Sequence, residues 1–194
     1  SEVYGIVDKN KLPIKENYET LPINPYAASR LSQEILSKIY IDGYGLKIIM
    51  TRSFNHCGLN QDRRFFIPNV INQIFDKKLK SISLGNLDII RDYINVEDVS
   101  EAYIKLLLYG KVGQIYNVCA GIGYSLKEIV NKIFIISDIE KPIKKNKIFE
   151  RPIDNPVIVG DYSKINMETK WYPKLKLDDS LNMIILNEKK KNFI

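Results

Sequence analysis

The chain has 194 residues, which suits one domain or one domain with part of a second. Apolar residues make up 45% and charged residues 27%, values that exclude a disordered chain, a collagen-like repeat and a coiled coil. The formal net charge of +6 is spread thinly along the chain. It fits a protein that handles a small anion, but a chain that is simply rich in lysine gives the same excess, and the charge alone does not indicate nucleic-acid binding.

Cysteine content and hydropathy limit the class of protein further. Cys57 and Cys119 are too few for a disulfide framework, and no Cys/His spacing in the sequence fits a zinc site. No apolar run is as long as a membrane span, and the chain does not open on a signal-peptide pattern. These features predict a cytoplasmic protein without a membrane segment or a metal site.

The first regular elements that the sequence predicts are a long helix and a buried strand. Asn24 can cap a helix and Pro25 suits its first position. Apolar residues then recur at helical spacing: Ala28, Leu31, Ile35 and Ile39. Glycines at positions 43 and 45 should end this helix. Residues 46–52 contain an apolar run that includes Ile48, Ile49 and Met50, which predicts a strand buried in a parallel sheet.

Helices and strands keep alternating along the rest of the chain, which favours an α/β architecture. Strands are expected at residues 81–85, 114–119 and 156–161, and helices at 65–78, 96–109, 126–136 and 178–186. Ser125 and Glu128 have the spacing of a capping box at the start of one of these helices. The lysine-rich residues after position 186 are expected to be frayed.

The first candidate for chemistry is the pair Tyr26 and Arg30. The two residues are four apart on the expected helix, so their side chains share one face. A neighbouring positive charge lowers the pKa of a phenol by about 1–3 units, which helps a phenol to exchange a proton with a carbonyl or alcohol oxygen. Taken alone, the pattern also fits an ordinary tyrosine–arginine pair on a helix surface.

Several sequence segments occur in the order found in one enzyme family. They are SEVYG at residues 1–5, NPYAASR at 24–30, TRSFNHCGLNQ at 51–61, LGNLDIIRDYINVEDVSEAY at 84–103, IYNVCAGIGYSLKEI at 115–129 and ERPIDNPVIVGDYSKINMETKWYP at 150–173. Through them the whole chain resembles the extended short-chain dehydrogenase/reductases, in particular the GDP-mannose branch of the NAD-dependent epimerase/dehydratase family. FNHCGLNQ and RPIDNPVIVGD are closer to the patterns of GDP-4-keto-6-deoxy-mannose reductases than to those of the 4,6-dehydratases, although Gly-Leu-Asn replaces the usual Gly-Pro-Gly.

The resemblance implies the C-terminal part of a Rossmann-type parallel sheet plus a smaller α/β substrate-binding domain. Residues 1–54 would form the late part of the NAD(P)-binding domain with the catalytic helix. Residues 55–194 would mainly form the sugar-nucleotide-binding domain, with residues 88–110 packing back on the Rossmann part. The glycine-rich turn that holds the cofactor pyrophosphate in such folds does not occur in this sequence. We therefore expect the larger part of the nucleotide-binding domain to be missing and the isolated chain to be inactive.

The resemblance also implies catalytic roles. Tyr26 would protonate the C4 oxygen of the substrate. Arg30, which stands where the family usually has lysine, would keep a positive charge beside it and bond a ribose hydroxyl of NAD or NADP. The family's serine or threonine that bonds the reacting oxygen should lie just before Ser1, so Ser1 is either a neighbour of that hydroxyl or a poor substitute for it. Glu2 matches the glutamate that acts as a base in dehydratases, but reductases keep a glutamate there too.

Five further residues match positions that bind cofactor or diphosphate. Phe54 and His56 would contact the cofactor, although His56 fits equally a contact with substrate or a cap at the end of its strand. Arg91 and Arg151 match the two arginines that hold the diphosphate, because arginine binds phosphate through a bidentate fork. Asn55 matches an asparagine that contacts the same group, and it also fits a turn at the end of a strand.

The remaining candidates would approach the nucleoside. Gly85 and Asn86 match positions near the base, and Asp154 matches a position that bonds a ribose hydroxyl. Each of the three also fits an ordinary turn. For the two arginines the alternative is a surface salt bridge with the acidic neighbour in sequence, Asp92 for the first and Glu150 for the second.

These assignments predict an enzyme of sugar-nucleotide metabolism. The expected activity is the NAD(P)H-dependent reduction of GDP-4-keto-6-deoxy-mannose to GDP-rhamnose, by a protein that the resemblance implies to be a homodimer. GDP-mannose 4,6-dehydratase or another nucleotide-sugar epimerase or dehydratase is the alternative activity. A nucleotide-sugar-binding protein without catalysis is the alternative class. Nucleic-acid binding is not expected, because the sequence has no basic stripe rich in aromatic residues.

Overall fold

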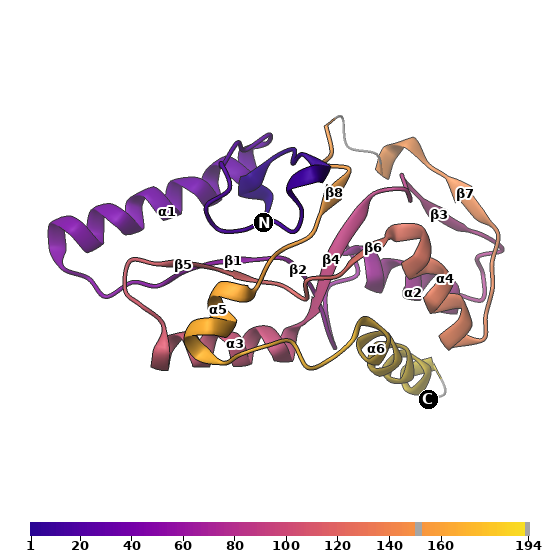
Figure 1. Ribbon diagram of the computed structural model, residues 1–194. Helices are drawn as coiled ribbons and strands as arrows, with labels where there is room; N and C mark the ends of the chain where they lie inside the picture. The colour runs from indigo at the N-terminus through magenta and orange to yellow at the C-terminus, as the bar shows by residue number, and fades with distance from the viewer. Residues whose placement is uncertain (150–152, 193–194) are drawn as a thin grey trace.

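The structure is a computed structural model that describes residues 1–149 and 153–192 (Figure 1). Its elements in chain order are η1 (Glu2–Tyr4), η2 (Lys9–Lys11), α1 (Pro25–Tyr44), β1 (Met50–Ser53), β2 (Asn55–Cys57), α2 (Phe66–Phe75), β3 (Ile82–Leu84), β4 (Ile90–Asn95), α3 (Val96–Tyr109), β5 (Ile115–Val118), β6 (Gly123–Ser125), α4 (Leu126–Ser137), β7 (Ile143–Lys145), η3 (Lys147–Phe149), β8 (Val157–Ile158), α5 (Ser163–Thr169) and α6 (Leu177–Asn192). This alternation of helices and strands confirms the predicted α/β class.

Strand pairing is mostly parallel. β1 pairs with β5, and β3 pairs with β7, in both cases in parallel. β4 is the central strand of the second sheet: one half of it pairs in parallel with β2, and the other half pairs with β6 in antiparallel and with β8 in parallel orientation. β4 therefore links the part of the molecule around β1 to the part around β3.

Helix α1 begins and ends where the sequence predicts. The side chain of Asn24 accepts a hydrogen bond from the backbone N–H of Ala27 at 2.8 Å, and Gly45 ends the helix in the left-handed conformation with φ 67°. Within α1, Ala27 is buried, whereas Ile35 of the predicted apolar stripe is 54% exposed. The side of α1 that bears Ile35 therefore does not pack against the sheet within the described residues. Figure 1 shows α1 extending beyond the strands.

Three clusters of buried side chains hold the elements together. The largest packs α2, α4 and α6 against β3 and β4, and lies on the right of Figure 1. The second packs α3 and α5 against β5, with Trp171 almost completely buried in it. The third lies beneath η1 and includes Tyr4, Phe54 and Ile158. Buried residues of β4 belong to the first two clusters. β4 therefore joins these clusters by side-chain packing as well as by strand pairing.

The two helices that flank the largest cluster differ in length from the prediction. α2 covers Phe66–Phe75 rather than residues 65–78. α6 continues to Asn192, so the lysine-rich residues up to position 192 are helical and the prediction of a frayed tail after residue 186 is wrong. Leu181 and Ile185 are buried against the other helices of the cluster, and this packing stabilises the part of α6 from which the lysine-rich turns continue.

The predicted start of α4 is confirmed by two hydrogen bonds at its first turn. The hydroxyl of Ser125 accepts a hydrogen bond from the N–H of Glu128 at 3.1 Å, and the Glu128 carboxylate accepts one from the N–H of Ser125 at 2.7 Å. This reciprocal pair is the predicted capping box. Among the described residues, no helix is both long and apolar enough to cross a membrane.

Candidate active site

A large cleft of about 1540 Å³ separates the α1–β1 side of the molecule from the side formed by α2, β3 and β4. All the predicted site residues that the structure describes line this cleft: Ser1, Glu2, Tyr26, Arg30, Phe54, Asn55, His56, Gly85, Asn86, Arg91 and Asp154. Arg151 lies outside the described residues. Sites for single small molecules usually measure about 300–1,000 Å³, so the cleft has room for more than one ligand.

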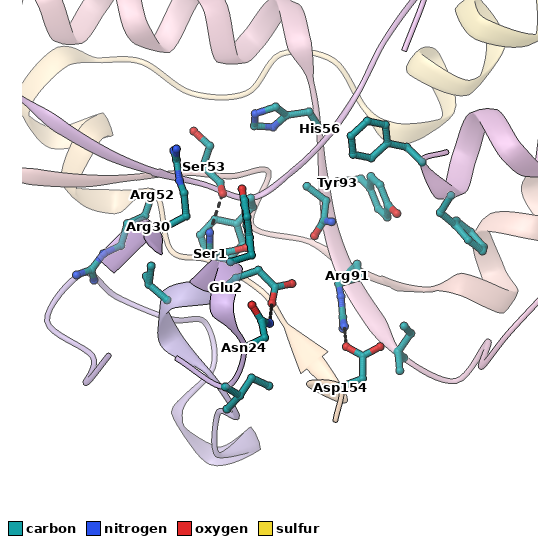
Figure 2. A pocket seen from close by; sticks show the side chains of 18 of the residues that line it. Ser1, Glu2, Asn24, Arg30, Arg52, Ser53, His56, Arg91, Tyr93 and Asp154 are labelled. Atoms are coloured by element: carbon teal, nitrogen blue, oxygen red, sulfur yellow. Dashed lines mark hydrogen bonds and ion pairs between the residues drawn. The ribbon is translucent and has the colours of Figure 1, made fainter. Parts of the chain in front are cut away.

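The α1 wall of the cleft carries Tyr26. This residue lies in the first turn of the helix with 63% of its surface exposed. Two contacts of Asn24 fix the turn: its Oδ1 accepts from the N–H of Ala27, and its Nδ2 donates to the carboxylate of Glu2 at 3.0 Å (Figure 2). Glu2 therefore supports the cap of the helix that presents Tyr26 to the cleft.

Two charged residues on the same wall were not singled out from the sequence. Arg52 donates from Nε to Oε1 of Glu34 at 2.8 Å and from Nη2 to Oε2 at 2.7 Å. Their side chains are only 6% and 13% exposed. Glu34 lies four residues after Arg30, so the helical spacing that linked Tyr26 to Arg30 could have extended the stripe to it. Its partner, Arg52, lies on β1, and no spacing pattern in the sequence links the two residues.

Arg52 is part of a larger buried network beneath the cleft. Its Nη1 donates to the carbonyl of Glu16 at 3.0 Å, and its guanidinium carbon lies 4.7 Å from the centre of the Tyr4 ring. The hydroxyl of Tyr4 donates to Oδ1 of Asn117 at 2.6 Å. Burial raises the pKa of Tyr4 to about 12 even though Arg52 lies over its ring. Tyr4 therefore stays protonated at neutral pH and acts as a fixed hydrogen-bond donor in the core.

His56 lies on β2 and lines the cleft. Its Nδ1 atom is buried and has no hydrogen-bond partner among the described residues. Burial also lowers the pKa of His56, so the imidazole is neutral at pH 7. A buried polar atom without a partner is costly, so the packing around His56 leaves one hydrogen-bonding group unmet among the described residues.

Arg91 and Asp154 form an ion pair on the other side of the cleft (Figure 2). Nη2 of Arg91 donates to Oδ1 of Asp154 at 2.7 Å, and Nη1 donates to the carbonyl of Asn155, also at 2.7 Å. The suggested alternative of a salt bridge with Asp92 is wrong, because neighbours on a strand point to opposite faces of the sheet. Asp92 instead accepts hydrogen bonds from backbone N–H groups, one of them from Ala120 at 2.8 Å.

Gly85 and Asn86 lie at the far end of the cleft, after β3. A Cβ atom on Gly85 would lie 2.7 Å from the carbonyl oxygen of Phe149, so the turn packs closely against η3 and only glycine fits there. The Asn86 side chain accepts the N–H of Asp88 at 3.0 Å, which is the turn contact that the sequence offered as an alternative to ligand binding.

The cleft therefore carries arginine side chains on both sides. Figure 2 shows Arg30 and Arg52 on the side of α1 and β1, well apart from the Arg91–Asp154 pair. Arg30 makes no ion pair with any residue that the structure describes, whereas the other two guanidinium groups are anchored by carboxylates. An exposed phenol on the same helix face as one cation, together with an anchored cation at a distance, suits a ligand with a polar oxygen at one end and an anionic group at the other.

Comparison with known proteins places this geometry in a family. A family model described as GDP-mannose 4,6 dehydratase matches residues 1–184. GDP-6-deoxy-D-mannose reductase of Pseudomonas aeruginosa is 31% identical over 188 residues, which cover 95% of this chain and 62% of the reductase. GDP-6-deoxy-D-talose 4-dehydrogenase of Aggregatibacter actinomycetemcomitans is 35% identical over 163 residues, which cover 84% of this chain and 54% of that enzyme.

A solved structure agrees with these matches in fold. The structure of RMD from Pseudomonas aeruginosa complexed with NADPH superposes with a TM-score of 0.91 at 30% sequence identity, covering 98% of this chain and 64% of that one. The chain thus spans less than two thirds of the length of each of these relatives. Since the family model covers nearly the whole sequence, the chain belongs to the GDP-mannose 4,6-dehydratase family of nucleotide-sugar enzymes.

Proposed function

We propose that the native protein containing these residues reduces the 4-keto group of a GDP-linked 4-keto-6-deoxy sugar, GDP-4-keto-6-deoxy-mannose in the first instance, to GDP-rhamnose. The observation that carries the proposal is that Tyr26, Arg30, Asn55 and Arg91, which come from separate segments of the sequence, line one cleft. Two relatives support the position of the reaction: one is named a 6-deoxy-D-mannose reductase and the other a 6-deoxy-D-talose 4-dehydrogenase, both with GDP as the carrier.

The residues of the α1 side fit the nicotinamide end of a dinucleotide cofactor. Arg30 is a cation without an ion-pair partner among the described residues, and Phe54 and His56 line the same cleft. We infer that Arg30 bonds a ribose hydroxyl and that Phe54 and His56 contact the ring end of the cofactor. When bound, the reduced nicotinamide supplies a hydride to C4 of the sugar. The choice between NAD and NADP is open; the solved relative of Pseudomonas aeruginosa holds NADPH.

Tyr26 provides the second half of the reduction. As the C4 carbon gains the hydride, the C4 oxygen gains negative charge, and the hydroxyl of Tyr26 donates its proton to that oxygen. The C=O bond becomes a CH–OH group, and the phenolate left on Tyr26 is stabilised by the positive charge of Arg30 one helical turn away. Ser1 and Glu2 line the same end of the cleft, where Glu2 holds the helix cap through Asn24.

The diphosphate would lie at the other end. Arg91 is held in place by Asp154 and by the Asn155 carbonyl, so its guanidinium needs little ordering when an anion binds. Asn55, at the start of β2, offers an amide on the path between Tyr26 and Arg91. We propose that Arg151 supplies a second cation and that Gly85 and Asn86 approach the nucleoside.

The direct test is to incubate the purified native protein with GDP-4-keto-6-deoxy-mannose and NADH or NADPH. Loss of the reduced-nicotinamide absorbance together with formation of a GDP-6-deoxyhexose supports the proposal. Binding of GDP without turnover would instead identify a nucleotide-sugar-binding protein. Homodimer formation stays a prediction from the resemblance, and sedimentation of the same sample measures it.

A GDP-mannose 4,6-dehydratase activity is the second candidate, because Glu2 lines the cleft close to Tyr26 and the matching family model carries that description. The same protein incubated with GDP-mannose and no added reductant distinguishes the two. A dehydratase forms the 4-keto-6-deoxy product, whereas a reductase leaves GDP-mannose unchanged.

Replacing Arg91 by lysine should weaken GDP binding by about tenfold. Lysine keeps the charge but loses the bidentate fork, and each lost charge-assisted hydrogen bond is worth about 1.5–3 kcal/mol, of which a lysine contact recovers part. Calorimetric titration with GDP measures the change. Arg64→Lys is the matched control, because Arg64 also lines the cleft but is 87% exposed and pairs with Asp62. Unchanged GDP affinity in Arg91→Lys would mean that the Arg91–Asp154 pair serves the fold alone.

A further inference from the structure

Three residues of α1 form one stripe along the cleft. Tyr26, Arg30 and Glu34 follow one another at intervals of four residues, so each lies beside the next on the helix surface, and all three line the cleft. Arg30 therefore has two neighbours on its own helix, the phenol of Tyr26 and the carboxylate of Glu34. A carboxylate attracts a guanidinium more strongly than a neutral phenol does, so Glu34 would take Arg30 if nothing else held it.

Arg52 binds Glu34 and so keeps this carboxylate from pairing with Arg30. It reaches across from the end of β1 and donates to both carboxylate oxygens, at 2.8 and 2.7 Å. Bidentate pairs of this kind are stronger and more directional than single contacts. The pair is almost fully buried, so water and salt screen it little. Arg30, by contrast, makes no ion pair within the described part of the chain.

Arg52 is itself fixed by neighbours that lie outside the cleft. Its Nη1 donates to the Glu16 carbonyl, and its planar group stacks on the ring of Tyr4, whose hydroxyl donates to Asn117. Glu16 follows η2 and Tyr4 lies in η1, so Arg52 is held from two further directions in the orientation that engages Glu34.

We infer that Arg52 is a positioning residue for the proposed reduction: by holding Glu34, it keeps the positive charge of Arg30 available to Tyr26. The inference rests on the proposed function and explains how its acid is kept effective. Without Arg52, Glu34 would be a largely buried carboxylate without a cation, which is unfavourable, and Arg30 lies one turn away. Arg52 acts through Glu34 and Arg30 and touches no reacting atom.

The test compares Arg52→Gln with the double variant Arg52→Gln/Glu34→Gln in the native protein. Arg52→Gln should lower kcat by about tenfold, the effect of losing about 1.4 kcal/mol of stabilisation of the phenolate that proton transfer leaves on Tyr26, while GDP affinity stays within about twofold of wild type. The double variant removes the competing carboxylate together with its partner, so most of the lost kcat should return. Arg52→Lys, which keeps a cation beside Glu34, should retain most of the wild-type kcat.

A purely structural role predicts a different result. If Arg52 only anchored α1 to β1, the double variant would be as slow as Arg52→Gln or slower, and that outcome overturns the inference, as does a wild-type kcat in Arg52→Gln. Ile165→Val is the stability control, because Ile165 is fully buried in the separate α3–α5 cluster. It lowers the free energy of unfolding without altering the stripe, and its kcat should stay at the wild-type value.

A crystal structure of Arg52→Gln gives a readout that does not depend on turnover. The inference expects an ion pair between Arg30 and Glu34 in that variant, and two separated side chains overturn it. If wild type reduces no keto sugar, the proposed function fails, and the crystal structure alone then decides whether Arg52 keeps Glu34 from Arg30.

Discussion

Replacing Tyr26 by phenylalanine should lower kcat for the keto sugar by about 10²–10⁴-fold, the usual contribution of a positioned general acid. Phenylalanine has no proton to donate to the C4 oxygen, so the charge that develops there stays uncompensated. GDP should bind with nearly unchanged affinity, because the proposed diphosphate contacts of Asn55 and Arg91 do not involve the phenol. Steady-state kinetics measures the first quantity and calorimetric titration with GDP measures the second.

The fold should tolerate the change at this position. Tyr26 is 63% exposed, and no hydrogen bond of its hydroxyl is found within the described residues, so the midpoint of unfolding should not move. Tyr44→Phe is the matched control: it makes the same substitution on the same helix, outside the cleft. If Tyr26→Phe keeps a tenth or more of the wild-type kcat, Tyr26 is not the acid.

The features of the fold that depend on short-range contacts could be predicted from the sequence. Asn24 and Pro25 open α1, Gly45 ends it, and Ser125 with Glu128 caps α4, as expected. Each of these signals acts between residues at most four positions apart, so local geometry decides it. The packing of α6 is different: Leu181 and Ile185 lie against α2 and α4, and no local pattern encodes this contact between distant segments.

The same distinction applies to the cleft. The stripe that begins with Tyr26 and Arg30 follows from helical spacing, and its third member, Glu34, could have been added on the same ground. The partners that anchor the charges could not be predicted. Arg52 lies 18 residues from Glu34, and Arg91 lies 63 residues from Asp154. Such contacts depend on how the strands are arranged in space, and no local sequence pattern encodes that arrangement.

Adjacent residues of β4 face opposite sides of the sheet and therefore have different partners. Arg91 faces the cleft and pairs with Asp154, whereas the neighbouring Asp92 points to the opposite face and is completely buried. The Asp92 carboxylate accepts hydrogen bonds from three backbone N–H groups, those of Ala120 at 2.8 Å, Gly121 at 2.9 Å and Gly160 at 3.2 Å. It therefore ties the segments after β5 and β8 to β4, directly behind the proposed diphosphate site.

Asp92→Asn should change how the stability of the protein depends on pH. Burial raises the pKa of Asp92 from its ordinary value of 3.8 to about 6, because the three N–H groups only partly offset the loss of water. The folded state thus holds this proton more tightly than the unfolded chain. That favours folding fully below about pH 4, and the advantage is lost as the pH rises through about 6. The shift corresponds to about 3 kcal/mol.

Asparagine has no proton to release in this range, so the free energy of unfolding of wild type relative to Asp92→Asn should fall by about 3 kcal/mol between about pH 4 and pH 7. The amide also places an NH₂ group against one backbone N–H, which costs about 1–3 kcal/mol. That cost is the same at both pH values. The change with pH of the difference in free energy of unfolding therefore reports the titration of Asp92 alone. Asp42→Asn, on the exposed surface of α1, removes the same charge without disturbing a backbone N–H and should show no such slope. Equal differences between wild type and Asp92→Asn at both pH values would mean that Asp92 stays ionised throughout, held by its three donors.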